Sequence, residues 1–550
     1  MKHAITFLII MIWSTSVFSS RIEVSSIPSS QDTTFGVNWD ADTILVMGNL
    51  MIGSNMHCDI AIKTGAVVYF TGPYGINIYS YTSSFNAVGT KDDSIVFTSP
   101  DSIRWNGIRF SFVGAYNKKV RNINFSYCKV ERCTTRVLLF EGFDTLSQLT
   151  LTHNSFKDNK SATPCVTITP GGTNVPLFKT LISNNLFVNN EGGAVKITNY
   201  NHKNDSIATI LIENNLFSGN NAAIGGAITI SGEKVLIRNN RFENNQAKRA
   251  GGAIYVEVSS SIIERNVFVR NSVDFSSSNL PGTTGGGALY LMNGAQERDF
   301  SAPCVVSNNL FAFNQSPNGG AIHCNDARTI LINNTICNNL STNGGGIYFE
   351  TIMSYVRLYN TIIWGNKLKT GVDNQCYIYN AKPDFYNCVL DGGTAAIVIN
   401  DTVVGAKIYP GKYTNCLDVF PEFVDSLSGN FRLVQRSPCI NKGITDTSGL
   451  NIGTVDLDSN PRIQSTIIDI GCYEVMPVAS VVNLCPKPKT QHQLVIPNRM
   501  VIIKKPGLER NPSGYFNLMG CHSASGAING MSTGVYIKMN AAVNTRNRAP

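Results

Sequence analysis

Acidic and basic side chains are the first candidates for chemistry, and in this chain they are scattered. Lys248 and Arg249 are adjacent, whereas Asp158, Glu191 and Arg270 each follow a separate short apolar run. Hydrolysis of a glycosidic bond needs two carboxylates that face each other across the sugar. Sequence spacing gives no such pair, so no catalytic residue is identified.

Polar residues that could bind a ligand gather in two stretches, Ser272–Thr284 and Asn293–Pro303. They contain four charged candidates for ligand contacts: Asp274, Glu297, Arg298 and Asp299. In a repetitive fold, insertions map to loops on one face, often the binding face. We therefore expect one lip of a carbohydrate-binding groove here. A tolerated surface loop is an equally good explanation, because lengthening a loop costs little free energy.

Metal and cofactor sites have little support. Asp456, Asp458 and Asn460 have the one-three-five spacing of a calcium loop, but Pro461 replaces the glycine and Ile467 the final glutamate. A turn is the better interpretation, so no metal and no cofactor is expected, with Ca²⁺ the single ion that the spacing suggests. The 7 histidines are dispersed, and the 14 cysteines, which form no CxxC pair, fit disulfides in an oxidising compartment.

A repeated phrase indicates the elements that must position these residues. It occurs at Leu181–Asn190, Leu211–Asn220 and Leu236–Asn245, each time followed by Gly-Gly-Ala and a β-branched residue. The phenylalanines at 187, 217, 242 and 268 are spaced by 30, 25 and 26 residues. A period in this range is typical of a solenoid. The step from Phe268 to Phe311 is 43 residues, and the two polar stretches supply the excess.

The phrase predicts short strands separated by asparagine and glycine turns. Each apolar run is too short for a helix and rich in β-branched residues. Stacking like over like predicts three columns, which are listed here: Asn185, Asn215 and Asn240 as an amide ladder; Phe187, Phe217 and Phe242 as an inner aromatic stack; and Glu213, Arg238 and Glu264 as a solvated charge column. The predicted fold class is all-β: a single-stranded right-handed parallel β-helix solenoid with a small C-terminal β-sandwich-like domain.

The bulk composition is that of a large β protein, with 550 residues, 43% hydrophobic, 47 glycines and a net charge of +8. No basic run is dense enough to indicate nucleic-acid binding. Residues 1–20 have the pattern of a secretory signal peptide, with Lys2 and His3 before the apolar core and Val17–Ser19 at the cleavage site. No later run is long enough for a transmembrane segment. We expect an exported chain, extracellular or on the outer cell surface.

Composition shifts divide the rest of the chain. The β-helix is expected over 21–475, with its first coils at 35–112, repeats at 120–390 and a closing segment at 415–475 that shields the open end of the solenoid. A proline-containing linker follows at 476–489, and a C-terminal domain at 490–550.

Three resemblances add to this interpretation. The repeats resemble the pectate-lyase-like superfamily, with the pectin lyase fold. Their FxxN and GGA[ILV] pairs, as in Phe217–Asn220 with Gly225–Ile228, resemble polymorphic outer-membrane proteins, whose members are adhesins. Gly514–Gly520 and Met531–Lys538 resemble a type IX secretion C-terminal sorting domain.

The resemblances imply two functions between which fold alone cannot decide. One is a secreted or cell-surface protein that binds glycans or mediates adhesion. The other is a polysaccharide lyase or glycoside hydrolase acting on an extracellular polysaccharide. The implied partners are a polysaccharide or host glycan and the type IX secretion machinery, and a monomer is expected.

Overall fold

A computed structural model gives the structure of this chain. The residues it describes are listed here: 20–25, 35–52, 58–79, 82–111, 122–143, 147–170, 179–199, 210–232, 235–257, 260–277, 284–292, 303–351, 355–400, 411–464, 467–476, 515–516, 522–523 and 537–538. They divide between two compact units, Met1–Val478 and Ala479–Pro550.

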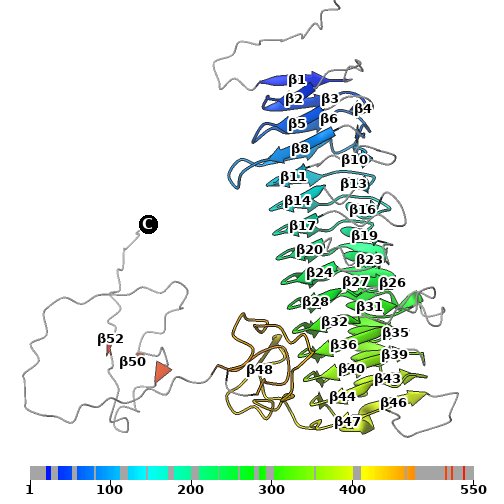
Figure 1. The fold of residues 1–550 in the computed structure, drawn as a ribbon, viewed down its shortest axis with the longest axis vertical. Helices are drawn as coiled ribbons and strands as arrows, with labels where there is room; N and C mark the ends of the chain where they lie inside the picture. The colour runs from blue at the N-terminus through cyan, green and yellow to red at the C-terminus, as the bar shows by residue number, and fades with distance from the viewer. Residues whose placement is uncertain are drawn as a thin grey trace, which may run out of the picture. The chain divides into compact units, whose positions relative to one another are not determined.

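The first unit is a right-handed parallel β-helix in which each coil adds one strand to each of three long sheets (Figure 1). Sheet A has 14 strands: β1 (Arg21–Val24), β3 (Thr43–Val46), β6 (Val67–Phe70), β9 (Ile95–Thr98), β12 (Cys128–Glu131), β15 (Ser155–Lys157), β18 (Leu186–Val188), β21 (Leu216–Ser218), β25 (Arg241–Glu243), β29 (Val267–Val269), β33 (Leu310–Ala312), β37 (Thr335–Cys337), β41 (Ile362–Trp364) and β45 (Val389–Leu390).

Sheet B precedes sheet A in each coil and also has 14 strands: β2 (Phe35–Trp39), β5 (Cys58–Ile62), β8 (Thr82–Val88), β11 (Asn122–Ser126), β14 (Gln148–Thr152), β17 (Lys179–Ser183), β20 (Ile210–Glu213), β24 (Val235–Arg238), β28 (Ile262–Glu264), β32 (Cys304–Ser307), β36 (Arg328–Ile332), β40 (Tyr355–Tyr359), β44 (Asp384–Tyr386) and β47 (Tyr413–Thr414).

Sheet C follows sheet A in each coil and has 13 strands: β4 (Leu50–Ile52), β7 (Ile76–Ile78), β10 (Ile108–Ser111), β13 (Leu138–Phe143), β16 (Val166–Pro170), β19 (Val195–Asn199), β23 (Ile228–Gly232), β27 (Ile254–Glu257), β31 (Leu289–Met292), β35 (Ile322–Asn325), β39 (Ile347–Glu350), β43 (Cys376–Tyr379) and β46 (Ile397–Asn400). Two one-turn 3-10 helices, η1 (Phe275–Ser277) and η2 (Gly393–Ala396), complete the coils.

A shorter sheet D lies between sheets A and C in the middle coils, with six strands: β22 (Asn221–Ile224), β26 (Gln246–Ala250), β30 (Ser272–Val273), β34 (Gln315–Asn318), β38 (Leu340–Asn343) and β42 (Lys367–Leu368). β30 lies within the stretch Ser272–Thr284, which we expected to be an inserted loop. That expectation is wrong for its first two residues, because Ser272 pairs with Gln246 and Gln315 and the Val273 side chain is buried.

The sharp corners of the coil come from residues with left-handed backbone. Asn184 and Asn214 stand before sheet A at φ 57° and 56°, and Asn189 stands after it at φ 54°. Asparagine tolerates this conformation at low cost. Gly226 serves another need, because a Cβ there would lie 2.1 Å from the carbonyl oxygen of Gly252 in the next coil. The Gly-Gly pair therefore permits close stacking of the turns.

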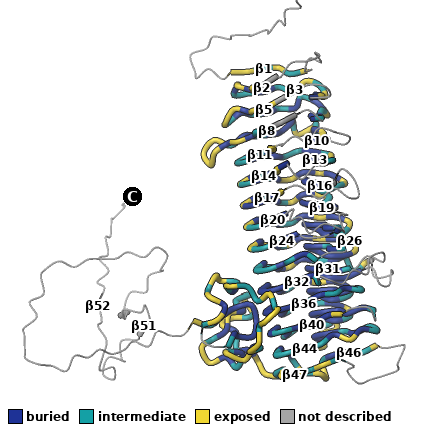
Figure 2. The backbone as a smooth tube through the Cα atoms, viewed as in Figure 1, coloured by how far each residue is buried: buried dark blue, intermediate teal, exposed yellow. Residues whose placement is uncertain are grey.

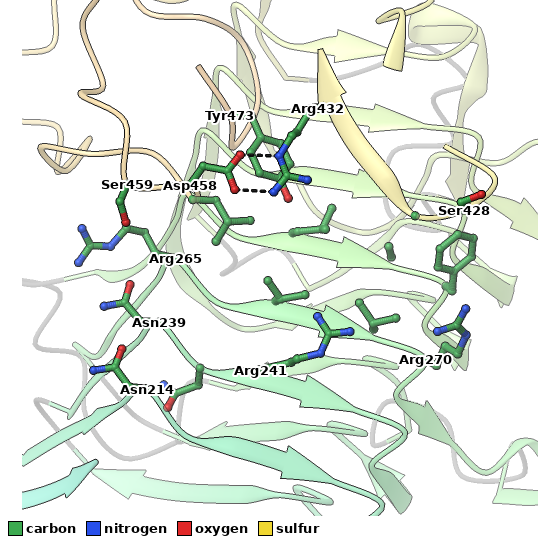
Figure 3. A pocket seen from close by; sticks show the side chains of 18 residues that line it. Asn214, Asn239, Arg241, Arg265, Arg270, Ser428, Arg432, Asp458, Ser459 and Tyr473 are labelled. Carbon is green, nitrogen blue, oxygen red and sulfur yellow. Dashed lines mark hydrogen bonds and ion pairs between the residues drawn. The ribbon is translucent and has the colours of Figure 1, made fainter. Parts of the chain in front are cut away.

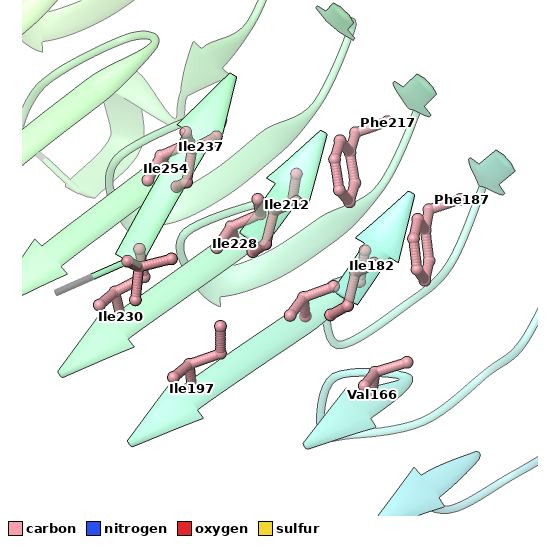
Figure 4. Close-up of a cluster of buried hydrophobic side chains, with 14 of the residues drawn as sticks. Val166, Ile182, Phe187, Ile197, Ile212, Phe217, Ile228, Ile230, Ile237 and Ile254 are labelled. Atoms are coloured by element: carbon pink, nitrogen blue, oxygen red, sulfur yellow. The ribbon is translucent and has the colours of Figure 1, made fainter. Parts of the chain in front are cut away.

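The predicted columns are confirmed. Phe187, Phe217 and Phe242 are buried in the core, where their rings stack in parallel with centroids 5.0 and 4.8 Å apart. Figure 4 shows the first two of these rings. The stack extends to Phe156 at one end and Phe311 at the other. Alternation within each strand sends every second side chain inward, so the burial pattern runs along the whole solenoid (Figure 2).

The predicted amide ladder is also confirmed, and a second one runs parallel to it. Asn185 donates its amide to Asn215 at 3.0 Å, and Asn215 donates to Asn240 at 2.9 Å. Asn190 and Asn220, the last residues of their FxxN motifs, continue the same pattern from Asn159 one turn further along the coil. The Asn159 amide donates to Asn190 at 3.0 Å, and the Asn190 amide donates to Asn220 at 2.9 Å. The FxxN motif therefore encodes the second ladder.

The charge column is confirmed as a surface feature. Glu213 pairs with Arg238 and Arg238 with Glu264 in adjacent strands of sheet B. The guanidinium of Arg238 lies 2.8 Å from the Glu213 carboxylate, and both side chains are partly exposed. A pair of this kind contributes about 0–1 kcal/mol, so the column is a solvated ladder.

The closing segment differs from expectation in its position. Residues 415–476, which include the antiparallel strands β48 (Phe423–Asp425) and β49 (Asn430–Leu433), pack on the outer face of sheet A beside the last coils (Figure 1). We expected them to shield the open end. Leu310, Ile362 and Val389 point outward from sheet A and are buried by this segment. The apolar outer face, rather than the exposed strand edges, is what the segment covers.

The second unit contains the antiparallel strands β50 (Tyr515–Phe516), β51 (His522–Ser523) and β52 (Ile537–Lys538). The signal-peptide pattern, the linker and the remainder of this unit lie outside the described residues. In the part of the chain that is described, no helix has the length and hydropathy needed to cross a membrane.

Candidate functional site

The closing segment creates a cleft where its edge meets the outer face of sheet A. The cleft has a volume of about 530 Å³, within the range of pockets that bind small ligands (Figure 3). Its floor is formed by β25, β29 and β33, and its far wall by residues 428–432, 457–459 and Tyr473. The site therefore joins residues about 200 positions apart in the sequence.

The floor of the cleft is apolar. Phe268 and Phe311 occupy the inward positions of β29 and β33, so strand alternation turns the residues on either side outward. Four of these outward residues line the cleft: Val267, Val269, Leu310 and Ala312. Val269, Leu310 and Ala312 are buried, so Val267, which is partly exposed, is the floor residue that a ligand could contact.

Four arginines surround this floor: Arg241, Arg265, Arg270 and Arg432. Asp458 is the single carboxylate among the lining residues, and it is held by Arg432 through two contacts of 2.5 Å. Arg241 is paired with Glu243 at 2.6 Å and Arg265 lies 3.5 Å from Glu264, so carboxylates just outside the lining offset part of the positive charge of the cleft. Arginine forms paired hydrogen bonds with planar or tetrahedral anions more readily than lysine does.

Arg265 and Arg270 have an unusual backbone conformation. Their φ angles are 52° and 55°, in the left-handed region, and they lie at the two ends of β29. In the preceding coil the equivalent corners carry Asn239 and Asn244, at φ 55°. Arginine has no side-chain oxygen to compensate for this conformation, which costs about 1–2 kcal/mol. Strained positions of this kind cluster at functional sites.

The two arginines differ in their contacts. The Arg265 Nη2 atom lies 3.5 Å from the Glu264 carboxylate, while its buried Nε–H has no hydrogen-bond partner among the described residues. The Arg270 guanidinium lies over the ring of Phe313, 5.5 Å from its centroid, and its side chain is exposed. Both retain donors that a ligand could use.

The wall opposite is more rigid. The guanidinium of Arg432 is 4.9 Å from the centroid of the Tyr473 ring, and its hydrogen bonds to Asp458 raise the pKa of Arg432. Burial raises the pKa of Tyr473. Arg432 therefore stays charged and Tyr473 neutral over the neutral pH range, and two hydrogen bonds hold Arg432 to Asp458 at the rim.

A second hollow, of about 760 Å³, lies on the outer face of sheet C near the N-terminus of the solenoid. Met51, Asn77, Arg109 and Leu139 contribute to it. Arg109 is paired with Glu141 at 2.8 Å, so the hollow offers little unpaired charge. The cleft beside the closing segment is the stronger candidate.

Of the residues predicted to bind a ligand, Asp274 is described, and it does not line this cleft. Asp274 follows β30 on sheet D, where its carboxylate accepts the Ser276 N–H at 2.9 Å and begins η1; this hydrogen bond lowers the pKa of Asp274. Glu297, Arg298 and Asp299 lie outside the described residues.

The scattered charged residues remain scattered in the structure. Asp158 and Glu191 take part in ion pairs with Lys157 and Lys160, at 3.7 and 3.9 Å. Of the basic residues singled out from the sequence, Arg270 lines the cleft and Lys248 and Arg249 do not.

The sequence did carry a signal for the cleft. Outward positions of sheet A are apolar from Val267 onward, at Leu310, Cys337 and Ile362, although such positions normally face water. This change indicates that another part of the chain covers them. It does not reveal which part, so Arg432, Asp458 and Tyr473 could not be identified.

The segment with calcium-like spacing, residues 456–460, forms a turn, as predicted. The Asp456 carboxylate accepts backbone N–H groups of Asp458 and Asn460 at 2.9 and 2.7 Å, and that of Glu474 at 2.8 Å. Across the described residues, no three His, Cys, Asp or Glu side chains converge in a way that would hold a metal ion.

Comparison with known proteins bears on the fold. The family described as "Right handed beta helix region" matches residues 179–336. Among solved structures, pectate lyase Pel9A is similar, with a TM-score of 0.23 and 14% identity over 76% of this chain and 88% of that one. No curated protein matches the chain. For residues 179–336, the family match and the observed coils thus agree on a right-handed β-helix.

Proposed function

We propose that this protein binds an anionic polysaccharide in the cleft between sheet A and the closing segment. The observation that carries the proposal is the position of Arg265 and Arg270 at the two ends of β29 beside the cleft floor, where the lining carboxylate is already paired with Arg432 and Arg241 is paired with Glu243. A uronate carboxylate or a sugar sulfate would receive paired hydrogen bonds from these guanidiniums. The C–H face of a sugar ring would pack on Val267, which is partly exposed.

The alternative class, a polysaccharide lyase or glycoside hydrolase, has weaker support. A hydrolase needs two carboxylates that face each other, whereas the lining residues include Asp458 alone, bound to Arg432. We therefore propose binding without turnover. Release of shortened or unsaturated products from an acidic polysaccharide would favour the enzyme instead.

The proposal includes export. The pattern of residues 1–20 supports passage through a secretory pathway, and the resemblance of Gly514–Gly520 and Met531–Lys538 to a sorting domain supports delivery to the outer surface by the type IX machinery. An adhesin of this kind would meet its polysaccharide outside the cell. Asp274, Glu297, Arg298 and Asp299 are proposed as further glycan contacts on neighbouring coils.

The test is an affinity measurement with matched polysaccharides. Calorimetric titration with polygalacturonate, a sulfated glycan and neutral dextran should give binding to the first two that weakens with added salt. Arg270→Gln should lose about tenfold in affinity, which corresponds to about 1.4 kcal/mol.

Arg357 supplies the control, because it projects from β40 of sheet B and is exposed. Arg357→Gln removes the same charge from another face and should leave the affinity unchanged. Equal binding of dextran, or an equal loss in both variants, would contradict the proposed site. Shortening the segments within 274–284 and 293–303, which leaves β30 intact, tests the further contacts in the same assay.

A further inference from the structure

The first amide ladder ends in two cysteines. Along most of the solenoid, the backbone N–H at this position donates to the asparagine side chain of the next coil, as Asn185 does to Asn215 at 2.9 Å. After Asn334 the position is occupied by Thr361, Cys388 and Cys416. The N–H of Cys388 donates to the Sγ of Cys416 at 3.4 Å. A thiol therefore takes the place of the amide between the last two coils.

The strand register places these two cysteines directly above each other. Tyr386 pairs with Thr414 two residues before them, and Val389 bridges to Leu417 one residue after them. Both pairs have the offset of 28 residues that separates Cys388 from Cys416. Neighbouring parallel strands lie about 4.8 Å apart, and a disulfide joins Cα atoms about 4.4–6.8 Å apart. The backbone separation suits a disulfide.

Both cysteines are free thiols in the structure, and their surroundings are unequal. Each is hydrogen-bonded to the carbonyl oxygen two residues earlier, at 3.4 Å, so both side chains point the same way. A hydrogen bond from the Cys388 thiol lowers the pKa of Cys416, whereas burial raises the pKa of Cys388. Of the 11 cysteines whose surroundings the structure describes, Cys416 is the one that is not buried.

The pair lies where the chain leaves the solenoid for the closing segment. Leu417 donates its N–H to the carbonyl of Cys388 at 2.8 Å and accepts the N–H of Leu390 at 3.0 Å. Beyond Asp418, which accepts the N–H of Gly392 at 2.9 Å, the chain crosses to the outer face of sheet A. A covalent link at this point would fix the start of the closing segment, which forms the far wall of the cleft.

We propose that Cys388 and Cys416 form a disulfide that locks the last two coils together. The oxidant is a disulfide of the exporting compartment, either a protein disulfide oxidoreductase or glutathione disulfide. The Cys416 thiolate attacks one oxidant sulfur, forming a mixed disulfide and releasing one thiol. The Cys388 thiolate then attacks the Cys416 sulfur and releases the second. Two electrons pass to the oxidant, and the two protons go to its departing thiolates.

The bond itself is tested by peptide mapping of the full chain. The protein is produced in an oxidising compartment, its free thiols are blocked with N-ethylmaleimide, and it is digested without reductant. Mass spectrometry should find the Cys388 peptide linked to the Cys416 peptide, and reduction or Cys416→Ser should abolish the linked species. Maleimide on both cysteines after native incubation with glutathione disulfide would overturn the proposal. So would a link from either cysteine to another partner.

Thermal unfolding gives an independent check. Reduction of the wild type should lower its melting temperature by several degrees, because the bond restrains the unfolded chain. The Cys388→Ala/Cys416→Ala protein should be insensitive to reductant, while Cys133→Ala, which alters a buried cysteine elsewhere, should respond like the wild type. A double variant that still responded to reductant would contradict the assignment to this pair.

Discussion

At the scale of single residues, the buried asparagines connect the backbone of one coil to the next. The Oδ1 of Asn245 accepts the backbone N–H and the side-chain amide of Asn220, at 3.0 and 2.9 Å. Its amide donates to the Phe217 carbonyl and to Asn271, both at 2.9 Å. Every polar atom of this side chain is thus paired in an otherwise apolar interior, which makes the ladder specific for coil register.

Replacing Asn245 by alanine should destabilise the solenoid strongly. Several buried donors and acceptors would lose their partner, each costing about 1–3 kcal/mol, so we expect a loss of at least about 3 kcal/mol in the free energy of unfolding. Asn244→Gly is the matched control, because Asn244 is exposed at φ 55° and glycine adopts that angle freely. Denaturant unfolding measures both. Similar losses in the two variants would show that the ladder contributes little.

A buried charge cluster in the closing segment should make its stability depend on pH. Glu474 lies 3.3 Å from Arg462, and both side chains are 1% exposed. Burial is the largest influence on each, lowering the pKa of Arg462 and raising that of Glu474 to about 8, with Asp469 and Asp456 adding repulsion at Glu474. Burial raises the pKa of Asp469 as well.

The sign of the effect follows from proton binding. Folded Glu474 keeps its proton up to about pH 8, whereas its ordinary value is 4.5. The contribution of Glu474 to the free energy of unfolding is therefore fully present below pH 4.5 and is lost as the pH rises through about 8. Glu474→Gln should flatten this decline in melting temperature between pH 5 and 9, while Glu191→Gln, at an exposed turn, should leave it intact. An unchanged slope in Glu474→Gln would contradict the assignment.

At the scale of elements, the repeat phrase predicts the strands and side-chain stacking within the coils. It does not predict where the closing segment packs. The stacked Phe187, Phe217 and Phe242 follow from periodicity, because identical neighbours make register a local property. The packing of Phe431 against sheet A is set by contacts between segments about 120 residues apart, such as Phe313 with Phe431. No spacing rule encodes that contact, so the cleft could not be predicted.

The closing segment should detach without unfolding the solenoid if its apolar core is weakened. Phe431 of β49 is buried between this segment and sheet A, with its ring centroid 5.3 Å from that of Phe423. Phe431→Ala should cost about 3–5 kcal/mol and expose residues 417–476 to limited proteolysis. Val424→Ala, on the exposed side of β48, is the control. Simultaneous loss of the solenoid's own protease resistance would mean that the two parts unfold as one.

At the scale of the whole molecule, the proposed export and the proposed binding should be separable. If the last residues are a secretion address, deleting Gly514–Pro550 should trap the protein in the periplasm with its solenoid folded. Cell fractionation with an antibody to the solenoid measures this, and the full-length chain is the control. A truncated protein that still reached the cell surface would refute the sorting role.

The anionic polysaccharide proposed for this cleft would be bound by arginines at turn positions where asparagine adopts the left-handed backbone at lower cost. Arg265→Asn/Arg270→Asn restores the residue found at the equivalent corners of the preceding coil, Asn239 and Asn244. The exchange should relieve left-handed strain of about 1–2 kcal/mol per site. The same exchange removes two guanidiniums from the cleft.

The most direct measurement is therefore the affinity for polygalacturonate and the free energy of unfolding, determined together for the wild type and this double variant. We predict opposite changes: unfolding becomes harder or stays the same, while binding falls by about 100-fold, equivalent to about 2.8 kcal/mol. Undiminished binding by the stable double variant would contradict the account.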